Sequence, residues 1–149
     1  MPSRRQFILA LAAAALAPAL PLAAHAQAVF TEDGLALRGH DPVAYFTEGA
    51  PRRGLAEYAH EWQGAEWRFA SAENRAAFVA DPDAFAPQFG GYCAWAVAEG
   101  YLAPVDPNAW AIVDGRLYLN FNARIQRRWE RDIPGNLRRA NTNWPALGG

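Results

Sequence analysis

Two histidines and one cysteine are the side chains of this sequence that suit transition-metal chemistry. Cys93 is the only cysteine, and His40 and His60 are the only histidines after residue 26. A thiolate with two neutral imidazoles is a ligand set that suits copper or zinc. The sequence therefore offers Cys93, His60 and His40 as metal ligands, on the condition that the fold brings them to one point.

Each of these residues also has an interpretation without a metal. His60 alternates with Tyr58 and Trp62 along an expected strand, so its ring can anchor that strand to the core. Cys93 follows two glycines at an expected helix start, where a thiol can become a reactive thiolate, or it packs as a small buried residue. His40 can be an exposed loop residue. A nucleophilic Cys–His pair has no orienting third group in the sequence, which makes an enzyme the least favoured interpretation.

Aromatic side chains offer a second kind of site. Tyr58, Tyr92 and Trp95 are candidates for lining a pocket that holds a small ligand. Core packing is the other role that such large rings commonly take. The sequence leaves both roles open for these three residues.

Two β-hairpins are expected to support these side chains. The first covers residues 57–70 with a turn at Gln63-Gly64, and the second covers residues 110–121 with a turn at Asp114-Gly115. Asp-Gly between two apolar runs is a strong signal for a type I′ turn. A short strand or extended entry is expected at residues 29–38.

Helices are expected between and after the hairpins. Ser71 and Asn122 are good N-caps, and Pro134-Gly135 is expected to interrupt the last helical stretch. The expected helical segments are 42–46, 72–80, 92–98, 123–131 and 136–141. Together these elements predict the α+β class: a small single domain in which two β-hairpins form an antiparallel sheet packed by about four helices.

The first 26 residues read as a signal peptide of the twin-arginine (Tat) type. Arg4 and Arg5 precede an apolar, alanine-rich stretch that Pro18 and Pro21 break before it reaches the length of a membrane span. Ala24 and Ala26 have the small side chains and spacing that a signal peptidase needs. The sequence therefore predicts residues 1–26 as a Tat signal peptide, residues 27–149 as the mature domain, and a periplasmic location.

Charge and cysteine content limit the partners of the mature chain. The chain has 14 basic and 15 acidic residues, and residues 1–26 hold two arginines and no acid, so the mature part carries a net charge of −3. Nucleic acid is not expected as a partner on this balance. One cysteine excludes an internal disulfide. No segment after residue 26 is expected to span a membrane.

Several motifs give the chain a family resemblance. Residues 39–46 (GHDPVAYF) and 87–94 (PQFGGYCA) resemble two segments of exported YHS-domain proteins. Tyr58, His60 and Ser71 match the three residues that name that family. The resemblance covers roughly residues 34–147.

The resemblance implies a relation to metal-binding modules that occur in heavy-metal-handling proteins, including copper transporters. In metal-binding relatives, cysteines stand where this chain has Ala70 and Asn74. The function favoured by the sequence is transition-metal binding in the periplasm, with Cu or Zn held by Cys93, His60 and His40. The alternative is a metal-free module that binds a small ligand or a protein.

Overall fold

The computed structural model describes residues 14, 15 and 27–149, so nearly all of the predicted signal peptide lies outside the described residues. The described chain forms six strands, six α-helices and two 3₁₀ turns, Leu37–Gly39 and Gln88–Gly91. The strands are β1 (Thr31–Glu32), β2 (Leu35–Ala36), β3 (Leu55–Trp62), β4 (Ala65–Phe69), β5 (Asp106–Val113) and β6 (Arg116–Asn120). The helices are α1 (Ala44–Thr47), α2 (Ala72–Ala80), α3 (Pro82–Phe85), α4 (Ala94–Glu99), α5 (Ala123–Glu130) and α6 (Ile133–Leu147).

The first hairpin, β3–β4, forms one side of a four-stranded sheet with the order β1-β2-β4-β3. Its turn residues Gln63 and Gly64 both have positive φ, as a type I′ turn requires. Along β4, burial alternates as period-two side chains demand, with Ala65, Trp67 and Phe69 facing inward. One face of this sheet is thus available to bury against a helix.

Helix α2 covers that buried face. The Ser71 side chain accepts a hydrogen bond from the Asn74 backbone N–H over 3.1 Å and so caps the helix, as predicted. Phe78 of α2 lies 5.2 Å from the Trp67 ring and 5.1 Å from the Phe69 ring. These buried aromatic contacts attach α2 to the first hairpin.

The second hairpin, β5–β6, forms a separate two-stranded sheet. Asp114 and Gly115 both have positive φ in its turn, which confirms the predicted hairpin. Its buried side chains pack against the C-terminal helices; the Tyr118 ring, for example, lies 5.5 Å from the ring of Trp129 on α5. Asn122 caps α5 by accepting from the Ile125 backbone N–H, again as predicted.

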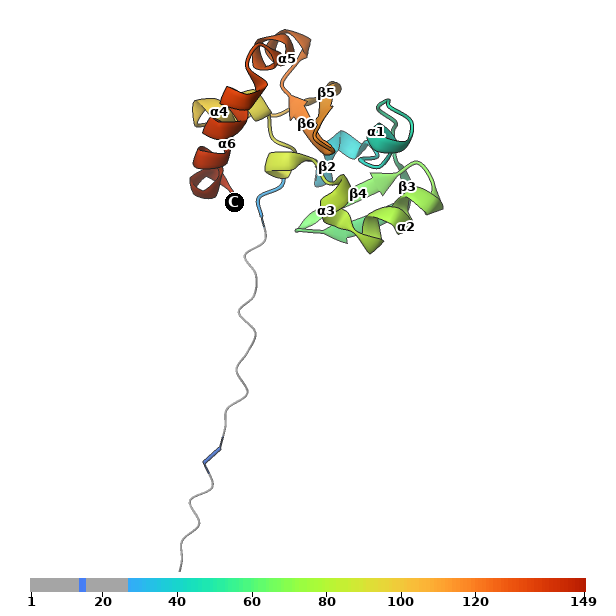
Figure 1. Ribbon diagram of the computed structural model, residues 1–149. Coiled ribbons are helices and arrows are strands. Elements are labelled where there is room, and N and C mark those ends of the chain that lie inside the picture. Colours follow the sequence, from blue (N-terminus) through green and yellow to red (C-terminus); the bar gives the residue numbers. More distant parts are fainter. Residues whose placement is uncertain (1–13, 16–26) are drawn as a thin grey trace, which may run out of the picture.

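The predicted α+β class with two antiparallel hairpins is confirmed, but the two hairpins do not form one sheet as predicted. They lie in different sheets, and β2 pairs with β4 in parallel, through Leu35 opposite Glu66. Figure 1 shows α4, α5 and α6 gathered around β5–β6, while α2 and α3 lie beside β3–β4. None of the described helices has both the length and the apolar character needed to cross a membrane.

Two helix boundaries differ from the prediction. The last helix begins at Ile133, so Pro134 lies in its first turn instead of interrupting it. The first turn has no intrahelical partners for its N–H groups, so proline costs little there, and Asp132 caps the helix by accepting from the Gly135 N–H. Helix α4 begins at Ala94 and not at Tyr92, because Gly90 and Gly91 belong to the preceding 3₁₀ turn.

Candidate functional site

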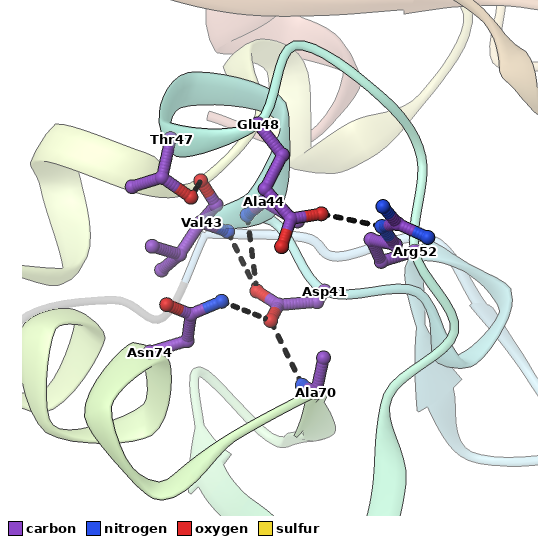
Figure 2. A network of polar contacts seen from close by, with 8 residues as sticks. All are labelled: Asp41, Val43, Ala44, Thr47, Glu48, Arg52, Ala70 and Asn74. Atoms are coloured by element: carbon purple, nitrogen blue, oxygen red, sulfur yellow. Dashed lines mark hydrogen bonds and ion pairs between the residues drawn. The ribbon is translucent and has the colours of Figure 1, made fainter.

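A fully buried carboxylate joins two of the motifs that the sequence singled out. Asp41 Oδ1 accepts hydrogen bonds from the backbone N–H groups of Val43 (2.8 Å) and Ala44 (3.3 Å). Asp41 Oδ2 accepts from the Ala70 backbone N–H (2.8 Å) and the Asn74 side-chain amide (2.7 Å). Figure 2 shows the carboxylate between these donors. Four N–H donors satisfy both oxygens, so the role of this buried carboxylate is to hold the surrounding backbone and side chain in place.

This arrangement gives Ala70 and Asn74 a role in the fold. Both residues hold the Asp41 carboxylate, and Ser71 between them caps α2. They occupy the two positions at which the resemblance places cysteines in metal-binding relatives. In this chain the same positions connect α1 to the β4–α2 junction through hydrogen bonds.

The three predicted metal ligands lie in three different environments. Cys93 is 1% exposed, at the start of α4, within an apolar cluster. His60 is half-buried on β3, opposite Trp67 and 6.4 Å from the Phe78 ring. His40 lines a polar cleft next to Arg53. Within residues 14, 15 and 27–149, no group of three or more His, Cys, Asp or Glu side chains could hold a metal ion, so this donor set does not fit a shared site.

The Cys93 side chain has the chemistry of a buried thiol. Burial raises its pKa above the ordinary value of 9.0, and backbone contacts around Ala96 and Phe121 offset this only in part. Its Sγ donates to Asn120 Oδ1 over 3.6 Å. Of the two roles that the sequence left open, the structure thus favours the buried thiol over the reactive thiolate.

The surroundings of His40 favour the neutral form of its ring. Burial lowers the pKa of His40 most, and the nearby Arg53 guanidinium lowers it further, while backbone contacts and Asp106 oppose the shift. His40 Nδ1 lies 3.3 Å from the carbonyl oxygen of Arg38. Because a carbonyl can only accept, this contact assigns the ring proton to Nδ1 and leaves Nε2 as an acceptor.

The three predicted pocket residues also separate. Tyr58 lies under the Arg75 guanidinium at 5.9 Å, and Tyr92 packs between the rings of Phe30 (5.7 Å) and Trp144 (6.3 Å). Trp95 lines a cleft, and Cys93 lines the same one. The structure therefore brings together one predicted metal ligand and one predicted pocket residue.

This cleft, called the apolar cleft below, has a volume of about 330 Å³. Every side chain that lines it is apolar or aromatic: Cys93, Trp95, Tyr101, Ala103, Phe121 and Ile125. Two of them stay unusually open to solvent, with Tyr101 51% and Phe121 48% exposed. Large apolar side chains that gather around a cleft typically mark a binding site.

Hydrogen bonds hold the floor of the apolar cleft in place. The Cys93 backbone N–H donates to the Ala103 carbonyl oxygen over 3.0 Å, which fixes the loop after α4. The Trp95 backbone N–H donates to Asn120 Oδ1 over 3.1 Å, which attaches the start of α4 to the end of β6. The Arg128 guanidinium lies over one face of the Trp95 ring, 5.7 Å from the ring centre. The cleft is thus preformed by contacts between three elements.

Four residues of the apolar cleft were not predicted as site residues: Tyr101, Ala103, Phe121 and Ile125. Tyr101 follows the helix-ending Gly100, and Phe121 precedes the cap Asn122. For Tyr101 and Phe121, the signal in the sequence is a bulky aromatic residue at an element boundary, outside the periodic pattern of a core face.

The comparisons with protein-family models, with curated proteins and with solved structures found no match for this chain. Membership of the YHS-domain family therefore stays a prediction from the motifs.

Proposed function

We propose that this chain is an exported, YHS-like periplasmic domain that binds a small apolar molecule in the apolar cleft. The observation that carries this proposal is the lining of the cleft, which combines a buried thiol, three aromatic rings and two aliphatic side chains. A volume of about 330 Å³ lies at the lower end of the range for small-molecule sites, so the ligand is small.

Solvent exposure of the cleft walls supports this function. Half of the surface of Tyr101 and of Phe121 contacts water in the free protein, and an apolar ligand would remove much of that surface from water. The hydrogen bonds that fix Cys93 and Trp95 mean that little ordering of the protein opposes binding. Binding is thus driven by burial on a preformed surface.

The metal-handling function predicted from the sequence receives less support. It requires Cys93, His60 and His40 to meet at one ion, and zinc–sulfur and zinc–nitrogen bonds are about 2.3 and 2.0 Å long. The described residues contain no such group, and the Cys93 thiol is hydrogen-bonded to Asn120. We therefore place the metal-free binding module first.

A fluorescence titration with 1-anilinonaphthalene-8-sulfonate, an anionic dye whose aromatic rings bind apolar surfaces, tests the proposal. Tyr101→Ser and Phe121→Ser each remove one exposed wall, so we expect each to weaken dye binding by about tenfold. Matched controls are Val79→Ser on α2 and Leu55→Ser on β3, because these side chains are 49% and 45% exposed but lie outside the cleft. Equal dye binding by all four variants, or no saturation, would contradict the apolar cleft as the site.

A further inference from the structure

A second cleft lies apart from the apolar one and differs from it in chemistry. This polar cleft has a volume of about 600 Å³ and lies between the β1–β2 turn, His40, Arg53 and the start of β5. Its lining includes Asp33, Leu35, His40, Arg53 and Pro107.

The backbone places His40 and Arg53 side by side. The two residues form an antiparallel bridge. Hydrogen bonds flank the bridge on both sides, since the Asp41 N–H donates to the Arg52 carbonyl oxygen and the Gly54 N–H to the Gly39 carbonyl oxygen, both over 2.8 Å. Opposite residues of a bridge project their side chains to the same face. An imidazole and a guanidinium therefore stand next to each other in the cleft.

The two side chains offer complementary hydrogen-bonding groups. In the neutral ring of His40 the proton is on Nδ1, which leaves the lone pair of Nε2 as a hydrogen-bond acceptor. The Arg53 guanidinium presents only donors, in a fork that matches a carboxylate. The cleft thus pairs an acceptor with a cationic donor at adjacent positions.

Some charged side chains of the cleft are paired with each other and others are not. Arg38 is paired with Glu32 over 2.7 Å, which leaves that pair neutral. Arg53 and Asp33 also line the cleft and belong to none of the ion pairs among the described residues. The residues that line the cleft therefore include one unpaired cation and one unpaired anion, and the carboxylate of Asp106 is a further negative charge close to His40.

We propose that the polar cleft binds a small zwitterion of the α-amino acid type. Its carboxylate pairs with the Arg53 guanidinium, and its ammonium group donates to His40 Nε2 and is drawn by the Asp33 carboxylate. An apolar substituent packs against Leu35 and Pro107. A ligand with only a negative charge would leave Asp33 unmatched, and a ligand with only a positive charge would meet Arg53. A molecule that carries both charged groups on one carbon fits the adjacent acceptor and donor.

Calorimetric titration of the mature protein with three related probes tests this inference. L-leucine carries both charges, leucinamide lacks the carboxylate, and 4-methylpentanoate lacks the ammonium group. We expect saturable binding of L-leucine. Both analogues should bind with an affinity at least about tenfold lower, because each loses a charge-assisted hydrogen bond. Equal binding of either analogue, or no saturable binding of L-leucine, would overturn the proposal.

Neighbouring arginines provide a matched pair of variants. Arg53→Gln removes the guanidinium that lines the cleft and should weaken L-leucine binding by about tenfold. Arg52→Gln removes the same group from the next residue, which is paired with Glu48 outside the cleft, and should leave binding unchanged. Tyr101→Ser separates the two sites, since it should weaken dye binding and leave L-leucine binding intact. Loss of L-leucine binding in Tyr101→Ser, and not in Arg53→Gln, would assign the amino acid to the apolar cleft and refute the polar site.

Discussion

The side-chain amide of Asn74 donates to Asp41 Oδ2 over 2.7 Å, although the two residues are 33 positions apart in the chain. Asn74 lies in the first turn of α2, and Asp41 stands just before α1 (Figure 2). The same carboxylate oxygen also holds the Ala70 N–H at the end of β4. One buried acid thus determines how the first helical turn meets the hairpin and its covering helix.

Removing the charge of Asp41 is expected to destabilise the fold strongly. In Asp41→Asn the new NH₂ group must face N–H donors at one of the two former oxygen positions, so we expect the free energy of unfolding to fall by about 3 kcal/mol. Asn74→Ala removes a single donor and should cost about 1–2 kcal/mol. Urea unfolding of both variants measures these losses.

The exposed Glu57 on β3 provides the control for this measurement. Its side chain makes no hydrogen bond or ion pair with the described residues, so Glu57→Gln should change the free energy of unfolding by less than about 0.5 kcal/mol. If Asp41→Asn behaved like Glu57→Gln, the hydrogen-bond network around Asp41 would not carry the stability assigned to it.

The Cys93 thiol is expected to react slowly in the folded protein. Its pKa is raised by burial, so at pH 8 the reactive thiolate is scarcer than in the unfolded chain. Alkylation by iodoacetamide, followed by mass spectrometry, should therefore be at least about tenfold slower in buffer than in concentrated urea. Because the chain has one cysteine, every added mass reports on this position.

The same shift gives a pH dependence of stability. Above pH 9.0 the thiol of the unfolded chain loses its proton while the buried thiol keeps it, so the unfolded state binds fewer protons. Stability from this group is complete below that pH and falls as pH rises above it. Equal alkylation rates in buffer and urea, or a stability difference between wild type and Cys93→Ala that does not change across pH 9, would contradict a buried thiol.

Metal analysis tests the function that the sequence favoured. Because Cys93, His60 and His40 lie in separate environments, we expect purified protein to take up less than one equivalent of Cu or Zn at a specific site after dialysis. Cys93→Ser should leave the metal content unchanged. Elemental analysis of both proteins decides the matter, and one bound equivalent that the Cys93→Ser substitution abolishes would restore the metal-handling proposal.

Export can be tested at the two arginines of the predicted signal peptide. Replacing Arg4 and Arg5 together by lysine keeps the charge but removes the pair that the Tat route recognises in the predicted motif. We expect the precursor to remain in the cytoplasm, as measured by cell fractionation and immunoblotting. Mature protein that still reaches the periplasm from this variant would indicate the general secretory route instead.

Local signals in the sequence predicted much of the fold. Ser71 and Asn122 cap helices, and Asp114-Gly115 makes a hairpin turn, because each of these effects depends on groups within four residues. The parallel contact between Leu35 and Glu66 was not predictable in this way. This contact joins residues that are far apart in the sequence, and no local sequence pattern encodes such a contact.

The sites were predicted less completely than the fold for the same reason. Cys93 and Trp95 are two residues apart, and their common cleft was within reach of the sequence. Tyr101 and Phe121 reach that cleft only because a loop and a strand end meet there. Arg53 meets His40 through a bridge at the end of an irregular loop, so neither hydrophobic periodicity nor a motif identified it.

The contact between Ala28 and Gly148 has a consequence for how the domain can be rebuilt. The Ala28 N–H donates to the Gly148 carbonyl oxygen over 2.8 Å, so the two extremities of the folded region adjoin. Adjoining extremities are the geometry that circular permutation needs. A short glycine linker across them, with a new opening at the exposed Asp114-Gly115 turn, would yield a permuted domain that retains both clefts.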